Sequence, residues 1–458
     1  MKKLLIANRG EIAIRIGQTA KELGYSTIAV FPEDDASALH VQQSDESVQI
    51  PGAGAQAYLN IEEIINAAKT CAADAVHPGY GFLSENPDFA KACDDAGINF
   101  VGPTAAQLSI FGNKAGARAL AAELGIPLVP GTNEDTSLAA VIDFQDQHPD
   151  KGVVIKAISG GGGRGMRIVE DRNEIEKSFE RCKSEANLAF GDDRVYVELL
   201  IHRARHIEVQ IVGDGTGGVT HLWERDCSTQ RQNQKIVEVA PSPNMPESTR
   251  TALLQASVKM ASHASYRGVG TFEFLVNADQ PDEFFFIEAN ARLQVEHTVT
   301  EAITGLDLVA LQLQIAAGET LDELGLSEPP ATNGYAIQCR INMETPGKKG
   351  MFKPTGGTIN IFEPPSGPGI RVDTFGYAGY KTSTRYDSLL AKLIVHSQSD
   401  DFSVCAGKTV RALSQFRLEG FKVNLPFLQT LVGSQDFHNA SLTTRYIDLN
   451  LASLVSEE

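Results

Sequence analysis

The first 110 or so residues alternate short apolar strands with turns and helices, and this alternation restricts the fold more than any other feature. A run from Leu4 to Ala7 has the length of a buried strand, and a turn containing Gly10 follows it. Apolar residues then recur at helical spacing up to Gly24, at Ile12, Ile16, Ala20 and Leu23. Further strands are expected at 27–31, 75–76 and 99–101. Strands that alternate with helices predict an α/β fold, in which helices cover a parallel sheet.

The turn after the first strand lacks the signature of a dinucleotide site. It reads Ala7-Asn8-Arg9-Gly10-Glu11, without the GxGxxG pattern that brings a pyrophosphate to a helix N-terminus. We therefore expect the N-terminal unit to be Rossmann-like in fold without binding a dinucleotide.

Charge and composition exclude several classes of protein. The chain has 458 residues, 42% of them hydrophobic, and its 40 basic and 58 acidic side chains give a net charge of −18. Such a field repels phosphate backbones and anionic membranes, so no nucleic-acid or membrane partner is expected. No apolar run approaches the eighteen or so residues that span a bilayer. Six cysteines without a CxxC pattern indicate neither a disulfide framework nor a thiolate zinc site, and the expected location is cytoplasmic.

Stop signals and composition divide the chain into three regions. A helix over about 113–124 ends at Gly125-Ile126-Pro127 and opens the second region. The third region follows Pro329-Pro330 and predicts α+β structure, with strands and two late helices. The expected boundaries are 1–112, 113–330 with a glycine-rich lid at about 130–202, and 331–450.

A glycine-rich loop joins two strands of the second region. It reads Ser-Gly-Gly-Gly-Gly-Arg-Gly over 159–165, between strands at 153–156 and 166–169. Glycines let backbone N–H groups close around phosphate oxygens, although a mobile surface hairpin has the same composition. The loop is not a Walker A loop, because no Lys-Ser/Thr pair follows it. Lys156 favours phosphate, since a lysine on a buried strand needs an anionic partner.

Two later strands each place a carboxylate among aromatic residues. They cover 270–275 and 285–290 and contain Glu273 and Glu288, and Asn290 ends the second strand. Carboxylate and amide oxygens are ligands for Mg²⁺ that bridges nucleotide phosphates, so a magnesium site is predicted. An edge-strand glutamate that faces solvent would explain one of these residues but hardly all three.

The segment that follows alternates polar and apolar residues. In an extended conformation its polar side chains share one face, at Asn290, Arg292, Gln294 and Glu296. The guanidinium of Arg292 suits an oxyanion, and the carboxylate of Glu296 can accept a proton. His297 is expected to be structural.

These features give the chain a resemblance to the biotin carboxylase component of biotin-dependent carboxylases, an ATP-grasp enzyme, from Lys3 to about Leu449. The resemblance implies a Rossmann-like N-terminal domain, an ATP-grasp central domain with a glycine-rich lid, and a C-terminal biotin carboxylase domain. Besides the lid glycines, the matching segments are 6–13 (Ile-Ala-Asn-Arg-Gly-Glu-Ile-Ala), 77–85 (His-Pro-Gly-Tyr-Gly-Phe-Leu-Ser-Glu), 224–228, 292–297, 339–342 and 386–388.

The resemblance implies a ligase that acts in two steps. ATP phosphorylates bicarbonate to carboxyphosphate, and its CO₂ then passes to a ureido nitrogen of biotin on a carrier protein or domain. This would be the first half-reaction of a biotin-dependent carboxylase, for example an acyl-CoA carboxylase. The implied partners are the biotin carboxyl carrier, a carboxyltransferase and a second copy of the chain.

The resemblance also implies a role for each matching residue. Catalysis would fall to Glu296 as the base, with Lys235, Arg292 and Arg340. Bicarbonate would contact Lys235, Arg292, Gln294 and Val295, and biotin would contact Tyr80 and Arg340, whose guanidinium can stabilise the ureido anion. The metal, Mg²⁺ or Mn²⁺, would be held by Glu273, Glu288 and Asn290. ATP would be held by Lys114, Lys156, Gly161, Gly162, Gly163, Arg164, Gly165, Glu198, Ile201, His206, Gln230, Asn233, Glu273, Leu275 and Glu288.

Four positions depart from what is common in the family. Asn233 stands where histidine is common and Leu199 where lysine is common, which affects contacts to the nucleotide. At the implied dimer contacts, Gln18 replaces an arginine and Pro368 a phenylalanine.

Two other functions remain open at this level. One is another ATP-grasp ligase that makes a carboxyphosphate or carbamoyl phosphate intermediate, against which Tyr80 and Arg340 argue. The other is a non-catalytic nucleotide-binding subunit, for which Asn233 is the only sign and which Lys235, Glu296 and Arg340 oppose.

Overall fold

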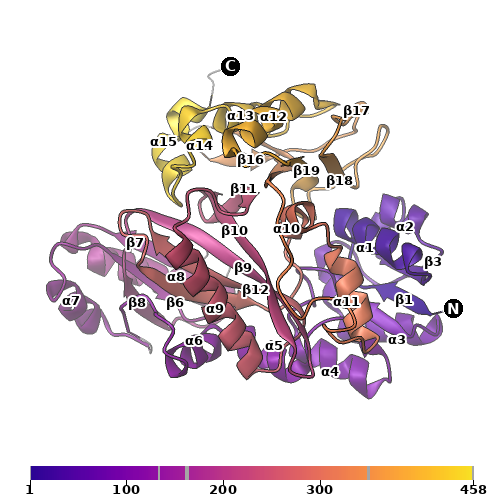
Figure 1. Cartoon of the computed structure of the whole chain (residues 1–458), viewed down its shortest axis with the longest axis horizontal. Coiled ribbons are helices and arrows are strands. Elements are labelled where there is room, and N and C mark those ends of the chain that lie inside the picture. The colour runs from indigo at the N-terminus through magenta and orange to yellow at the C-terminus, as the bar shows by residue number, and fades with distance from the viewer. Residues whose placement is uncertain (1, 133–134, 160–164, 348–350, 456–458) are drawn as a thin grey trace.

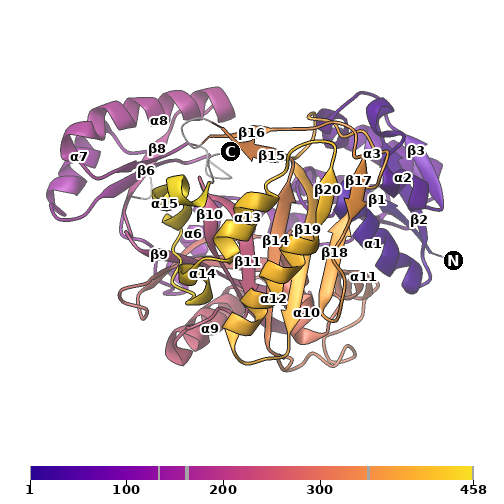
Figure 2. The same cartoon turned by 90° about the horizontal axis from the view of Figure 1, so that it is seen from above.

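The computed structural model describes residues 2–132, 135–159, 165–347 and 351–455. The N-terminal parallel sheet lies at one end of the molecule and a small lid sheet at the other (Figures 1 and 2). A large sheet runs between them, and the C-terminal helices cover part of it.

The N-terminal unit is a parallel sheet in the order β3-β2-β1-β4-β5. Its central strand β1 (Lys3–Ile6) leads into α1 (Gly10–Glu22), where Ile12, Ile16 and Ala20 are buried as the helical spacing predicts. The predicted α/β unit is therefore confirmed. Its other elements are β2 (Ser26–Phe31), η1 (Glu33–Asp35), α2 (Leu39–Gln43), β3 (Glu46–Gln49), η2 (Ala55–Leu59), α3 (Ile61–Thr70), β4 (Ala75–His77), α4 (Pro87–Asp95), β5 (Asn99–Phe100) and α5 (Ala105–Phe111).

The lid is a separate antiparallel sheet with its own small core. Strand β6 (Val153–Ala157) lies between β7 (Met166–Val169) and β8 (Val195–Leu199). Buried residues such as Val153, Val197 and Phe179 pack this sheet against α7 (Leu138–Asp146) and α8 (Ile175–Phe190). The short helix η3 (Arg172–Glu174) precedes α8. The preceding helix, α6 (Lys114–Glu123), starts where predicted because the side chain of Asn113 accepts hydrogen bonds from two N–H groups of its first turn.

An antiparallel sheet in the order β13-β12-β9-β10-β11-β14-β19-β18 joins the central and C-terminal regions. It crosses the boundary expected at residue 330, because Val237 of β11 pairs with Cys339 of β14. The strands are β9 (Ala204–Asp214), β10 (Val219–Arg231), β11 (Gln234–Ala240), β12 (Arg267–Asn277), β13 (Phe284–Asn290), β14 (Tyr335–Asn342), β18 (Ile370–Thr374) and β19 (Leu389–Ser397). The helices between them are α9 (Glu247–His263), α10 (His297–Thr304) and α11 (Leu308–Ala316).

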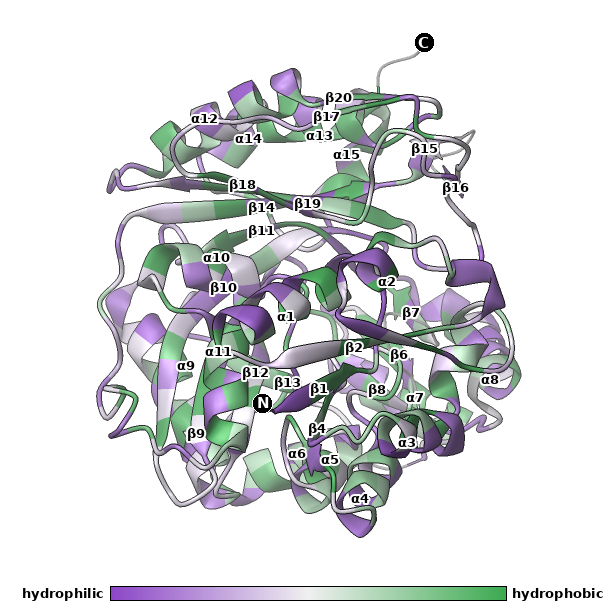
Figure 3. Ribbon diagram, turned by 90° about the vertical axis from the view of Figure 1, so that its right-hand side faces the viewer, coloured by the Kyte–Doolittle hydropathy of each residue, from purple (hydrophilic) through white to green (hydrophobic). Residues whose placement is uncertain are grey.

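The C-terminal region carries more late helices than the two predicted. Four lie on one side of the large sheet in the described residues (Figure 3): α12 (Phe402–Gln415), α13 (Leu425–Val432), α14 (Gln435–His438) and α15 (Tyr446–Leu454). Helix α12 packs on β14 and β19, whereas α15 packs on β10. The extra break arises at Gly433, because the next residue, Ser434, caps α14 through its side chain. Two short ribbons complete the region, β15 (Glu344–Pro346) with β16 (Phe352–Pro354) and β17 (Ile361–Glu363) with β20 (Arg417–Glu419).

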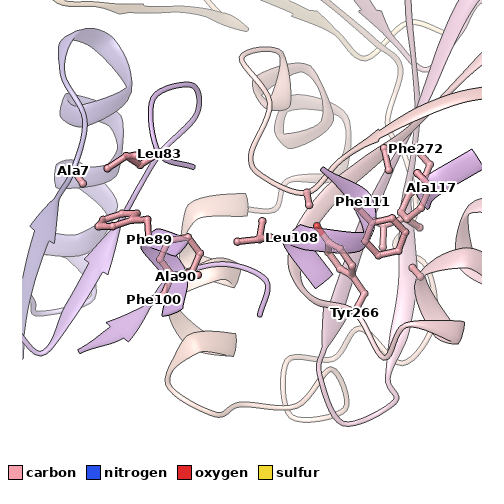
Figure 4. Packing of buried hydrophobic residues seen from close by; sticks show 14 of the residues in the cluster. Ala7, Leu83, Phe89, Ala90, Phe100, Leu108, Phe111, Ala117, Tyr266 and Phe272 are labelled. Atoms are coloured by element: carbon pink, nitrogen blue, oxygen red, sulfur yellow. The ribbon is translucent and has the colours of Figure 1, made fainter. Parts of the chain in front are cut away.

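Aromatic residues anchor the N-terminal unit to the large sheet. Phe89 and Phe100 meet edge to face with ring centroids 5.8 Å apart (Figure 4). Phe111 lies in the same core and contacts Tyr266 and Phe272 of the central region at 5.7 and 5.3 Å. One continuous core therefore joins the two regions, whereas the lid has its own.

No single helix in the described ranges is long and apolar enough to cross a membrane. Helices α10 and α11 meet a length and composition test only as a pair bent by 96°.

Candidate active site

The two predicted metal carboxylates face each other across neighbouring strands. Glu273 of β12 is the register partner of Glu288 of β13. Glu273 accepts hydrogen bonds from Asn290 Nδ2 at 2.7 Å and from Gln294 Nε2 at 3.0 Å, and its other oxygen lies 2.6 Å from His206 Nε2. Burial alone would raise the pKa of Glu273, but Lys235 and His206 hold it at about 2. The sheet thus brings the three predicted metal ligands to one place.

Glu288 shares this low pKa for a different reason. Burial opposes ionisation, and Lys114 Nζ at 2.8 Å outweighs it, so that the pKa of Glu288 is about 2. Both carboxylates are therefore ionised at neutral pH, as cation ligands must be.

Glu296 lies at the centre of a buried group of charges. It is 0% exposed, and its carboxylate meets Lys235 Nζ at 2.7 Å and Arg340 Nη2 at 3.1 Å. Burial raises the pKa of Glu296 and the charge of Glu208 adds to this, but Lys235 and Arg340 more than compensate and lower it below its usual value. Glu296 is therefore an ionised carboxylate able to accept a proton.

The extended conformation predicted for residues 290–297 is wrong. Strand β13 ends at Asn290, the chain turns, and Glu296 has φ −88° and ψ 10° as the residue before α10. The guanidinium of Arg292 nevertheless joins the neighbouring amides, donating to Asn290 Oδ1 and Gln294 Oε1 at 2.9 Å each. Local hydrogen bonds and the start of α10 override the polar alternation, and they direct Glu296 towards Lys235.

His297 is structural, as expected. It is fully buried, its Nδ1 lies 2.7 Å from the carbonyl oxygen of Gln294, and burial beside Lys392 holds its pKa well below the usual value.

Arg340 and Tyr80, the two residues expected to face biotin, each have a carboxylate partner. Arg340 Nε donates to Glu238 Oε1 at 2.5 Å while the same guanidinium reaches Glu296. The hydroxyl of Tyr80 donates to Glu11. Burial and the neighbouring Glu11 raise the pKa of Tyr80 well above its usual value, so Tyr80 stays protonated.

The expected ATP lysines are paired with protein carboxylates. Lys156 forms an ion pair with Glu198, which also meets Arg118 Nη1 at 2.6 Å. Glu198 thus gives Lys156 an anionic partner within the protein, so burial of Lys156 does not by itself require a phosphate. The β6–β8 pairing brings Lys156 and Glu198 to adjacent strands, and helix α6 supplies Arg118 to the same buried carboxylate.

The remaining ATP residues lie on strands of the large sheet or in loops next to the lid strands. Gln230 Nε2 lies 2.5 Å from His206 Nδ1, and Leu275 is the register partner of His206. Ile201 follows β8 in the link to β9, and Gly165 has a φ of 68° at the end of the glycine loop. The loop residues Gly161, Gly162, Gly163 and Arg164 lie outside the described residues.

The backbone conformation of a tight turn accounts for asparagine at position 233. With Gln232 it forms the two-residue turn between paired Arg231 and Gln234, and their φ values are 63° and 48°. Hairpin turns of this kind need positive φ at both positions, and asparagine tolerates it better than most residues.

Comparison with family models distinguishes a biotin carboxylase from another ATP-grasp ligase, since the geometry described above suits both. The model of the carbamoyl-phosphate synthase L chain, ATP binding domain, matches residues 113–324 and fits either kind of ligase. Residues 1–108 match the biotin carboxylase N-terminal domain, and residues 338–449 match the biotin carboxylase C-terminal domain. The chain belongs to the biotin carboxylase family. This confirms the resemblance seen in the sequence and the enzyme class, an ATP-dependent ligase.

Similar proteins include longer carboxylases that contain a biotin carboxylase part. The mitochondrial pyruvate carboxylase of Rattus norvegicus is 46% identical over 98% of this chain, which spans 38% of that protein. The pyruvate carboxylase of Staphylococcus aureus is 45% identical, and the chain spans 39% of it. The match thus covers well under half the length of these relatives.

Solved structures cover the biotin carboxylase fold from end to end. The biotin carboxylase domain of the Hydrogenobacter thermophilus 2-oxoglutarate carboxylase, a dimer with MgADP, ADP and bicarbonate, is 40% identical with a TM-score of 0.93, covering 100% of this chain and 99% of its own. The Campylobacter jejuni biotin carboxylase in a β,γ-ATP complex is 38% identical with a TM-score of 0.91, covering 98% of each chain. These likenesses confirm the predicted biotin carboxylase architecture.

Sequence reasoning missed several charged residues of this biotin carboxylase site. Glu208 contacts Lys235 Nζ at 2.6 Å and Arg225 Nε at 2.5 Å, and Cys227 Sγ lies 4.0 Å from Glu296. Two groups of potential cation ligands other than the predicted one therefore occur in the described residues, His206 with Glu208 and Glu273, and Glu208 with Cys227 and Glu296. Polar residues at every second position of the apolar strand β9 were the available signal.

Proposed function

We propose that the chain uses ATP and bicarbonate to carboxylate biotin on a carrier protein or domain. One observation carries this proposal: Lys235 Nζ lies between Glu273, at 3.2 Å, and Glu296, at 2.7 Å. Glu273 belongs to the expected nucleotide and metal side, and Glu296 to the expected bicarbonate side. With ATP and bicarbonate bound, this single ammonium group would adjoin both reacting anions and would stabilise negative charge that moves from one to the other.

Magnesium or manganese fits the donor set. Glu273 and Glu288 are ionised and face each other, and Asn290 adds an amide oxygen, which are the hard ligands these cations prefer. The bound cation would supply charge neutralisation at the ATP phosphates. Lys114, now paired with Glu288, and Lys156, now paired with Glu198, would be the protein cations on the phosphates.

The first chemical step uses Glu296 as the base. The O–H proton of bicarbonate passes to Glu296, the freed oxygen bonds to the γ-phosphorus of ATP, and the bond to ADP breaks, which yields carboxyphosphate. Arg292 would hold the bicarbonate, since its fork of donors already engages two amide oxygens that bicarbonate oxygens can replace.

The second step transfers the carboxyl group. The C–O bond of carboxyphosphate breaks to give CO₂ and phosphate, and a ureido nitrogen of biotin forms the new C–N bond while its proton leaves to phosphate or water. Arg340 is placed beside Glu296 and would stabilise the ureido anion.

Phosphate release with and without free biotin tests this function. Bicarbonate-dependent ATP cleavage that biotin stimulates is expected at saturating Mg²⁺. Cleavage that biotin does not change would support another ATP-grasp ligase, and the absence of cleavage despite nucleotide binding would support a non-catalytic subunit.

A carrier and a carboxyltransferase are proposed as partners, in separate chains or in one longer polypeptide. We also propose a homodimer, because the resemblance implies one and because Gln18, one of the implied contact positions, lines a surface cavity of about 460 Å³ together with Glu22 and Arg371. A cytoplasmic location is proposed, since all six cysteines lie in the described residues as free thiols.

A further inference from the structure

Lys392 is a fully buried lysine that the proposed function leaves without a role. It lies on β19 in the C-terminal region and is 0% exposed. Its Nζ lies 3.0 Å from Glu11 Oε2, 3.7 Å from Asp373 Oδ2 and 3.2 Å from the carbonyl oxygen of Val295. One ammonium group thus holds together the N-terminal, central and C-terminal regions.

Through Glu11, Lys392 is connected to Tyr80, which is expected to contact biotin. Glu11 lies in the first turn of α1, is buried, and accepts a hydrogen bond from the Tyr80 hydroxyl with its other oxygen. Because Tyr80 stays protonated and donates its hydroxyl hydrogen bond to Glu11, its oxygen has only acceptor capacity left for another group.

Through Val295, Lys392 is connected to the residues expected to bind bicarbonate. Val295 lies between Gln294 and Glu296 in the turn before α10, and Lys392 donates to its carbonyl oxygen. Asp373 is fixed independently by two hydrogen bonds from Arg371, each of 2.7 Å, so Lys392 contacts a rigid partner in its own region. These contacts give Lys392 little freedom to move.

We propose that Glu11 and Lys392 are a positioning pair, which holds the hydroxyl of Tyr80 as a hydrogen-bond acceptor for a ureido N–H of biotin and holds the turn that carries the bicarbonate residues. This inference rests on the proposed function. It assigns the pair no contact with substrate: Glu11 acts through Tyr80, and Lys392 acts through Glu11 and through Val295.

The two residues are distinguished by which substrate they affect. Glu11→Gln removes the charge that orients Tyr80, so kcat/KM for free biotin should fall about tenfold, with little change in KM for bicarbonate or ATP. Lys392→Met keeps an unbranched side chain, one atom shorter, and removes the ammonium, so it should lower kcat/KM for biotin by a similar factor and also raise KM for bicarbonate several-fold. Lys408→Met is the matched control, because Lys408 Nζ bonds to the carbonyl oxygen of His396 on the same strand, away from the site.

A double-mutant cycle with Tyr80→Phe gives the decisive readout. If Glu11 acts through the Tyr80 hydroxyl, Glu11→Gln should cause no further loss of kcat/KM for biotin once that hydroxyl is gone. Full additivity of the two losses would overturn the positioning role, and so would an equal loss in Lys408→Met. If Lys392→Met does not fold, the Glu11 and Tyr80 cycle still decides. Absence of biotin stimulation in the unmodified chain would instead overturn the proposed function and the biotin-side role with it.

Discussion

Replacing Glu296 with glutamine should reduce turnover by about 10²–10⁴ and leave nucleotide binding nearly unchanged. The amide has the shape of the carboxylate but cannot take the bicarbonate proton. That loss corresponds to about 3–5 kcal/mol in the activation barrier.

The surrounding charges explain why the variant should still fold. Lys235 keeps Glu208 at 2.6 Å and Glu273 at 3.2 Å, and Arg340 keeps Glu238 at 2.5 Å. No buried cation in this group is left without a carboxylate, so the cost in unfolding free energy should be about 1–2 kcal/mol rather than the larger cost of breaking an isolated buried pair. The variant should also favour the ionised form of Glu238. Burial and the charge of Glu296 both raise the pKa of Glu238, and glutamine at position 296 removes that charge.

The assay combines nucleotide titration with phosphate release at saturating bicarbonate. The matched control is Glu224→Gln, since Glu224 is equally buried and paired with Arg250 Nε at 2.9 Å, outside the candidate site. The control should lose stability without a selective loss of turnover. Unchanged turnover in Glu296→Gln would remove Glu296 from the chemistry and leave it as a structural partner of Lys235.

Three further outcomes are expected. Arg340→Ala should lower carboxybiotin formation by about 10²–10³ and largely spare biotin-independent ATP cleavage, because the ureido anion would depend on the Arg340 charge whereas Glu296 keeps Lys235 at 2.7 Å; equal losses in both assays would contradict this. The folded pKa values of Glu273 and Glu288 are about 2, against a usual 4.5, so their stabilisation is complete above about pH 4.5 and is lost as the pH falls towards 2. Urea unfolding between pH 5 and 3 should show a smaller loss of stability in Glu273→Gln than in the unmodified chain, and identical losses would refute the assignment. Gln18 and Pro368 stand where an arginine and a phenylalanine are common, so the proposed dimer should be weaker than is usual in the family by about one to three powers of ten, or be arranged differently. Sedimentation at micromolar and nanomolar protein checks this, and an undiminished family-type dimer at nanomolar concentration would contradict it.

Local patterns in the sequence account for much of the fold. The parallel unit follows from apolar runs and helical spacing over a few tens of residues, as at Ile12 and Ile16. Glu273 and Glu288 could be placed together because a short polar connection joins their strands, which makes an antiparallel pair the simplest arrangement.

Contacts between distant segments were beyond this reasoning. The pairing of β11 with β14 joins residues about a hundred positions apart, and no periodicity encodes it. The ion pair between Lys392 and Glu11 depends on that assembly. For Lys156, its burial correctly predicted an anionic partner, but sequence alone could not distinguish a protein carboxylate from a ligand. The extended conformation predicted from the polar alternation at 290–296 was wrong because the start of helix α10 determines the backbone there.

The eight-stranded sheet has a consequence for dividing this protein into fragments. A cut near residue 330 would separate β11 from β14 and leave each with an open edge of unpaired N–H and C=O groups. Strand β14 carries buried apolar residues such as Ile337 and Cys339, so a C-terminal fragment produced alone should pair edge to edge with other copies and aggregate. The lid strands form a sheet of their own, so deleting the lid would break no strand pairing of the large sheet. Sites for splitting or shortening this chain therefore follow its hydrogen-bond ladders rather than the boundaries at which its sequence changes character.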